Sequence, residues 1–265
     1  FKGGTSLLLH LDKPQRFSID VDIVSSSDKP ALTKAMNEVL RTGAFSRWTE
    51  DERPMRHDLP VEHYKFFYKS QFPSPTAENY ILLDVVYQTS LPHWTEQKVM
   101  QHPWLYTKNR PVEIIKQLFD IGCLYDQVET LGETQAAFHA IAEQQIQFRG
   151  MEITPQVVLE DAFQSALTIC DRDLKNQNFQ HLAKGIQNIK PHIFSRFVLE
   201  DAVVCASKTM LLSLLIQKKH QGVLPKFGAA KDVIGWLILT TDFNRFNKLK
   251  KTNPEAFFYL YQMAG

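Results

Sequence analysis

The chain has 265 residues, of which 44% are hydrophobic and 22% are charged, and its formal net charge is +1. This composition excludes a disordered or fibrous chain, and no apolar run reaches the roughly 18 residues that a membrane-spanning helix needs. The three cysteines, Cys123, Cys170 and Cys205, lie far apart without a CxxC pair. We therefore expect no disulfide framework and no cysteine-ligated zinc, and a reducing cytoplasm fits best.

The small net charge hides an uneven distribution. Residues 172–251 contain 14 Lys or Arg against 5 Asp or Glu, whereas the rest of the chain contains 16 basic and 24 acidic residues. This division favours a polyanion partner on one side and a cation site on the other. Solvated helix faces would give the same counts, so charge alone does not decide between the two interpretations.

The first third of the chain has the pattern of a mixed sheet. Residues 16–24 alternate apolar and polar side chains, which predicts a strand with Asp20 and Asp22 on its polar face. The apolar run over 6–11 follows two glycines and predicts the start of a helix or a turn. Further patterns predict a helix over 29–41, strands over 63–70 and 79–89, and a turn at 71–76.

Helical spacing dominates from Pro111 onward. It predicts helices over 111–131, 133–148, 155–169, 197–217, 231–239 and 254–263. The sequence therefore predicts an α+β protein in which residues 1–92 form a small sheet domain. Residues 93–265 would form a mainly helical domain with a basic face.

Three features could carry chemistry. Gly3-Gly4-Thr5-Ser6 precedes an apolar run, and backbone N–H groups at such a turn can bind a phosphate, although most strings of this kind are simple turns. Asp20 and Asp22 would lie about 7 Å apart on one strand face, where they could bind Mg²⁺ or simply face solvent. Asp84 stands in the aliphatic run 81–86, and a carboxylate there needs a partner or a metal unless it faces solvent.

Taken together, these features suit phosphoryl or nucleotidyl transfer, in which carboxylate-bound metal ions activate a hydroxyl and stabilise a leaving pyrophosphate. The sequence also resembles a known family. FKGGTSL at 1–7 followed by RFSIDVD at 16–22 resembles the AbiEii-type nucleotidyltransferases, toxins of type IV toxin–antitoxin and abortive-infection systems within the DNA polymerase beta superfamily. LDV at 83–85 and EIIKQLFDI at 113–121 resemble later motifs of that family.

The resemblance implies a minimal nucleotidyltransferase fold followed by a helical domain, with Mg²⁺ or Mn²⁺ and a nucleoside triphosphate as substrate. It implies an RNA acceptor, the 3′ end of tRNA above all, and a cognate antitoxin protein as partner. The implied metal ligands are Asp20, Asp22 and Asp84, the last as a ligand or general base. The implied nucleotide contacts are Lys2, Gly3, Gly4, Thr5 and Ser6, and Lys116 with Asp120 would complete the catalytic set.

The sequence departs from the family in one place. The family carries a lysine-bearing helix after the strand of the third carboxylate, whereas this sequence passes from Leu105 directly to Tyr106. We expect either that residues belong between these two positions or that the helix is deleted, which would put catalysis in doubt. We also expect residues before Phe1, since the chain begins without Met.

Several other side chains are assigned no catalytic role. The nine histidines show no paired-ligand spacing, so none is assigned to a metal. Aromatic residues at 64 and 66–68 could stack a base, but core packing is the more common role of strand aromatics. Two rival functions stay open: nucleotidyl transfer to a protein or small molecule, and a non-catalytic module that binds nucleotide or RNA.

Overall fold

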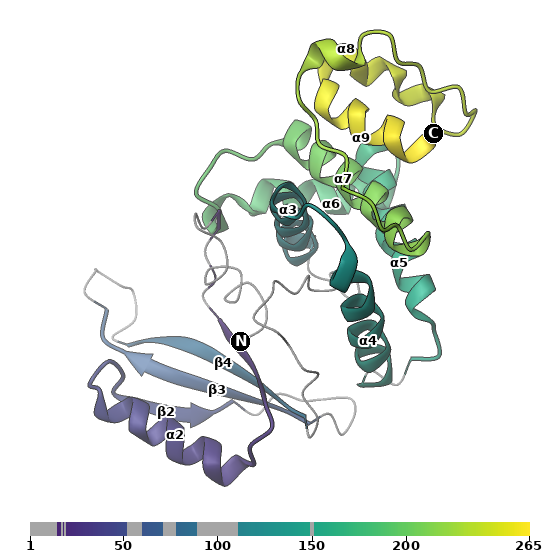
Figure 1. The fold of residues 1–265 in the computed structure, drawn as a ribbon. Coiled ribbons are helices and arrows are strands. Elements are labelled where there is room, and N and C mark those ends of the chain that lie inside the picture. The colour runs from purple at the N-terminus through teal and green to yellow at the C-terminus, as the bar shows by residue number, and fades with distance from the viewer. Residues whose placement is uncertain are drawn as a thin grey trace. The chain divides into compact units, whose positions relative to one another are not determined.

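The computed structural model describes residues 15, 16, 18, 20–51, 60–70, 78–88, 111–148 and 151–265. The chain divides into two compact units, Phe1–Lys98 and Val99–Gly265, which are described separately. The first unit contains a mixed sheet with a flanking helix and the second is helical (Figure 1), which confirms the predicted α+β class.

The sheet of the first unit has four strands in the order β1-β4-β3-β2. Their bounds are Val21–Ser25 for β1, Arg47–Glu50 for β2, Val61–Tyr68 for β3 and Asn79–Tyr87 for β4. β1 pairs with β4 in parallel, and the other two pairings are antiparallel. β1, β3 and β4 lie where the sequence predicts strands, whereas β2 is an additional edge strand.

One face of this sheet is covered by helix α2, Lys29–Arg41, whose bounds match the predicted helix. The Asp28 side chain accepts a hydrogen bond from the Ala31 amide at 3.0 Å, and Pro30 occupies the first turn, as expected at a helix N-terminus. Leu32 and Met36 of α2 form a small core with side chains from the sheet: Tyr64, Phe66 and Val85 are buried, and Ile23 and Leu83 pack against them.

Hydrogen bonds and an ion pair around Glu62 hold the start of α2 against the sheet. Glu62 accepts hydrogen bonds from Tyr64 and, at 2.6 Å, from Tyr87, and it pairs with Lys29 at 2.9 Å. Partial burial by itself would raise the pKa of Glu62, but these three partners together lower it below its ordinary value. Burial and the hydrogen bond to Glu62 raise the pKa of Tyr64 to about 12. The cluster therefore holds an ionised carboxylate.

The second unit is built around α7, Leu199–Gln217, which is buried along most of its length. It packs against α3 (Pro111–Gln127), α5 (Pro155–Asp171) and α9 (Pro254–Ala264). Further elements are α4 (Gly132–Phe148), α6 (Gln177–Asn188), α8 (Leu249–Thr252) and the short 3₁₀ turns Lys190–His192, Ala230–Val233 and Asn244–Lys248. None of the helices in the described residues is long and apolar enough to cross a membrane.

The predicted helix over 231–239 is wrong beyond its first turn. After Val233 the chain makes a turn at 234–235 and then leaves the helix, so that Trp236 is partly buried and Ile238 is buried while Leu237 and Leu239 are exposed. The Asn247 side chain bonds both the amide and the carbonyl of Ile238 at 2.9 Å, which replaces the hydrogen bonds of a helix. The apolar pattern of this segment therefore has a period of two residues, which a run of consecutive apolar side chains concealed.

Candidate functional site

Asp22 and Asp84 face each other on adjacent strands. β1 and β4 are parallel, and their register pairs these two residues directly. Neighbouring strands lie about 4.8 Å apart, so the two carboxylates leave the sheet side by side. Because Ile23, Leu83 and Val85 pack toward α2, alternation turns Asp22 and Asp84 to the opposite face. The structure thus brings together two residues that lie 62 positions apart in the sequence.

Asp20 lies just before β1 and is exposed. It stands two residues before Asp22 in the sequence, in a bend that leads into β1. The strand predicted over 16–24 is confirmed only from Val21, where Asp22 and Ile23 point to opposite faces, and Asp20 lies outside it.

His63 continues the row of Asp22 and Asp84 on the third strand. It is the antiparallel register partner of Asp84, and its Nδ1 lies 2.7 Å from Asp84 Oδ1. The His63 side chain is 15% exposed and that of Asp84 is 24% exposed, so water reaches this pair only in part. Asp84 therefore has a side-chain partner, which is one of the alternatives that its aliphatic surroundings left open beside a metal and solvent.

His63 is the residue of this site that sequence reasoning missed. Its strand was predicted, and Tyr64 and Phe66 fall on the buried face as expected of strand aromatics. The alternation alone therefore placed His63 on the other face. Only the pairing of β3 with β4, and its register, brings His63 to Asp84.

The donor set suits a hard cation. In the described part of the chain, no group of three or more His, Cys, Asp or Glu side chains lies close enough together to hold a metal ion. Mg²⁺, however, is commonly bound through one or two carboxylates together with substrate phosphates and water. The facing pair Asp22 and Asp84 provides such oxygens, and Asp20 is the nearest carboxylate before Asp22 in the sequence.

The other predicted site residues lie elsewhere. Lys2, Gly3, Gly4, Thr5 and Ser6 fall outside the described residues, as does the junction of Leu105 and Tyr106. Lys116 and Asp120 lie on α3 in the second unit. There Lys116 Nζ donates to Glu113 Oε1 at 2.9 Å, one turn earlier on the helix. Their predicted role in catalysis stays a prediction.

Residues 1–105 match the family model described as "Nucleotidyl transferase AbiEii toxin, Type IV TA system". This segment is similar to the nucleotidyltransferase domain of the AbiEii toxins. The matched residues include Asp20, Asp22 and Asp84, and also His63. The family is one of nucleotidyltransferase toxins of toxin–antitoxin systems, so an antitoxin partner is implied. The chain matches no curated protein and no solved structure.

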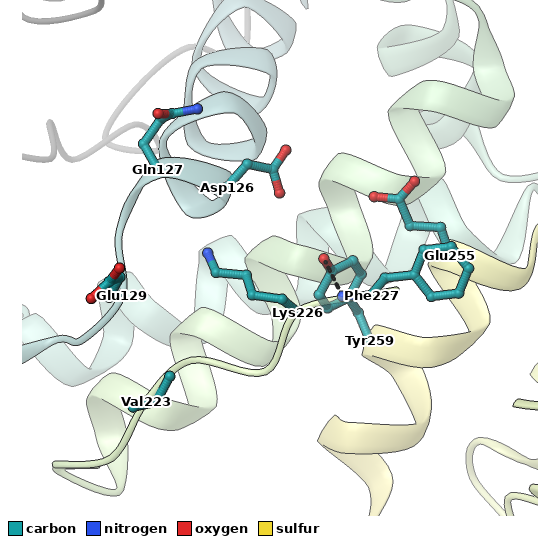
Figure 2. Close-up of a pocket in the computed structure, with 8 residues that line it drawn as sticks. All are labelled: Asp126, Gln127, Glu129, Val223, Lys226, Phe227, Glu255 and Tyr259. Atoms are coloured by element: carbon teal, nitrogen blue, oxygen red, sulfur yellow. Dashed lines mark hydrogen bonds between the residues drawn. The ribbon is translucent and has the colours of Figure 1, made fainter. Parts of the chain in front are cut away.

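The second unit contains a polar cavity of about 790 Å³, shown in Figure 2. Its lining includes the carboxylates of Asp126, Glu129 and Glu255, the Lys226 side chain and the buried Tyr259. Burial lowers the pKa of Lys226, and its ammonium donates to the Tyr125 carbonyl. Lys226 is thus bound to the helical unit itself.

Basic residues of the second unit are partly used inside the fold. Lys208 pairs with Asp126 and Glu255, Arg245 binds Asp171, and Lys250 donates to backbone carbonyls of the 234–236 turn. The count of cations over 172–251 therefore overstates the charge that is free to meet a polyanion. Burial raises the pKa of the thiols of Cys170 and Cys205.

Proposed function

We propose that the AbiEii-like domain transfers a nucleoside monophosphate from a nucleoside triphosphate to an RNA acceptor, with the 3′ end of tRNA as the expected acceptor. The observation that supports this most is the row formed by Asp22, Asp84 and His63 on the face of the sheet opposite α2. The family match over residues 1–105 gives the reaction class.

The expected cofactor is Mg²⁺ or Mn²⁺, held by Asp22 and Asp84 with Asp20 as the third carboxylate. When bound, such an ion polarises the α-phosphate and neutralises the charge that develops on the leaving pyrophosphate. The residues of this chain then position the reaction. His63 holds the Asp84 carboxylate in one orientation, and an acceptor hydroxyl beside Asp84 can pass its proton to that carboxylate or to water.

In the proposed reaction the acceptor oxygen forms a bond to the α-phosphorus while the bond to the β-phosphate oxygen breaks. Pyrophosphate leaves in line with the attacking oxygen. The Gly-Gly-Thr-Ser segment at 3–6, together with Lys2, is proposed to bind the triphosphate. Lys116 and Asp120 are proposed to complete the catalytic set. We further propose that the protein acts in the reducing cytoplasm as the toxin partner of an antitoxin.

The test uses purified protein, total tRNA, Mg²⁺ and each α-labelled nucleoside triphosphate in turn. Asp22→Asn and Asp84→Asn should each lower label transfer by roughly a thousandfold, which corresponds to several kcal/mol of lost stabilisation of the transition state. Glu38→Gln is the matched control, because this exposed carboxylate lies on α2, which covers the other face of the sheet.

The recipient of the label decides between the candidate functions. Label in tRNA that depends on Asp22 and Asp84 would establish the proposed reaction. Label found in protein or in a small molecule would show that the acceptor is that molecule and not RNA. Binding of triphosphate without transfer to any acceptor would contradict enzymatic function for this chain and favour a binding module.

A further inference from the structure

A cluster of aromatic and basic side chains shares the sheet face of Asp84. On β3, Phe67 and Lys65 lie four and two residues beyond His63, so alternation places them on the same face. Phe67 is the register partner of Tyr80 on β4 and of Arg47 on β2. We call these four residues, Arg47, Lys65, Phe67 and Tyr80, the stacking platform.

The platform side chains are arranged as two cations over two rings. The Arg47 guanidinium carbon lies 3.5 Å from the centroid of Phe67, and Lys65 Nζ lies 5.2 Å from the centroid of Tyr80. The two ring centroids are 5.8 Å apart. Such contacts fix the planes of the rings and of the guanidinium, so the platform is preorganised.

Two carboxylates hold these cations in place. Arg47 binds Glu78 at 2.8 Å, and Lys65 binds Asp51 at 2.6 Å. Both pairs are partly solvated, and ion pairs of this kind are weak enough for a phosphate to take the place of a carboxylate. The cations can therefore remain on the rings or turn to an anionic ligand.

Tyr80 carries the exposed ring of the platform, and the Arg47 side chain is also exposed. Tyr80 is 47% exposed, although it belongs to a central strand, whereas Tyr64 and Phe66 of the neighbouring strand are buried. Nucleic acids that are single-stranded bind to such surfaces by stacking their bases on aromatic rings and guanidinium planes while cations contact the phosphates. The residue types on this face match that mode of binding.

The distance to the carboxylates suits an RNA strand. Tyr80 lies four residues before Asp84 on β4, which is about 13 Å along the strand. Stacked nucleotides rise by about 3.4 Å each, so a strand that ends at Asp84 would place a base three or four nucleotides back at Tyr80. The platform also extends to β2, the edge of the sheet, where a long ligand can leave the protein.

We propose that the stacking platform binds an unpaired base of the acceptor RNA, and its neighbouring phosphate, a few nucleotides before the end that reacts. The inference rests on the proposed function in that it names where the acceptor binds. It commits to single-stranded RNA rather than to the base of the triphosphate, since the platform lies toward the edge strand β2 and away from β1 with Asp20 and Asp22.

The test measures binding separately from transfer. A short, fluorescently labelled single-stranded RNA is titrated with the full chain, and a fluorescent triphosphate analogue is titrated in parallel. Tyr80→Ala should weaken RNA binding by about 5- to 150-fold, the effect of losing one base stack. Tyr80→Phe keeps the ring and should bind RNA as the unchanged protein does. Arg47→Ala tests the guanidinium of the platform in the same titration. Its control is Lys34→Ala, which removes an exposed cation from α2.

The outcomes separate this inference from the proposed function. Equal RNA affinity of Tyr80→Ala and the unchanged protein would overturn the platform, and so would a loss of triphosphate binding in place of RNA binding. If the unchanged protein transfers no label to RNA but binds it through Tyr80, the transfer function fails and the platform stands. If transfer proceeds and Tyr80→Ala leaves the KM for RNA unchanged, the platform fails and the function stands.

Discussion

The ion cluster around Lys208 gives a sharp stability prediction for the helical unit. The Lys208 side chain is 4% exposed, and its ammonium lies 2.8 Å from Asp126 and 3.0 Å from Glu255, whose side chains are 49% and 38% exposed. Burial alone would lower the pKa of Lys208, but the hydrogen bond to Asp126 and the charges of both carboxylates raise it above its ordinary value. The cation is thus the desolvated partner, while water reaches both anions.

Removing the two carboxylates should therefore destabilise the protein more than removing the ammonium of Lys208. Asp126→Asn with Glu255→Gln leaves a buried ammonium without a counter-ion, which costs about 3–5 kcal/mol. Lys208→Met removes the buried charge and keeps the length of the side chain, and water solvates the two carboxylates left behind. We expect that variant to lose about 1 kcal/mol. The triple variant should recover most of the loss, because no buried charge remains in it.

Urea unfolding followed by circular dichroism at neutral pH measures these costs. Because the folded pKa of Lys208 is raised, its contribution to stability is complete below the ordinary lysine value of 10.5 and is lost only as the pH rises through the folded value. Neutral pH therefore reads the full effect. The reasoning is refuted if Lys208→Met costs as much as the double carboxylate variant, or if the triple variant is no more stable than the double.

Three further predictions concern single residues. His63→Ala should lower RNA labelling by about ten- to a hundredfold, because the Asp84 carboxylate loses the charge-assisted hydrogen bond that His63 makes to it at 2.7 Å. His63→Gln can still donate a hydrogen bond, so it should lose less activity. Equal losses in the two variants would contradict a positioning role of His63. Glu62→Gln should lower the free energy of unfolding at pH values above the ordinary glutamate pKa of 4.5. The difference between the variant and the unchanged protein should shrink as the pH falls through the lowered pKa of folded Glu62. A difference that does not change with pH would argue against the cluster around Glu62. Gly185→Ala should cost about 1–3 kcal/mol in thermal unfolding, since a new Cβ would lie 2.4 Å from the Pro111 carbonyl oxygen, whereas Gly132→Ala, with open space around it, should be neutral.

Local patterns in the sequence were sufficient for elements whose pattern is regular over many residues. The helix at 29–41 combines an Asp cap, a proline in the first turn and an amphipathic face, and all three act within the segment itself. The strands at 63–70 and 79–89 were found for the same reason, to within two residues at each end. These features require no knowledge of what packs against them.

Elements that depend on their neighbours were missed. β2 has four residues and only Trp48 is apolar among them, so its strand form comes from pairing with β3 at the sheet edge. α6 was missed for another reason, since its signals are local: Phe179, Leu182 and Ile186 are buried on one face, and the Asn176 side chain caps its start. The segment from Trp236 does not continue the helix predicted there, and Asn247, from a later turn, binds the backbone of Ile238 instead.

The candidate site divides in the same way. The sequence by itself determined the carboxylates Asp20, Asp22 and Asp84 and the family that residues 1–105 resemble, because residue types and short spacings are properties of the chain. Only the tertiary structure decided that Asp84 lies opposite Asp22 and is bound by His63, and that Tyr80 stays exposed on the same face. Strand order and register bring these side chains together, and both follow from packing between distant segments, which local periodicity does not contain.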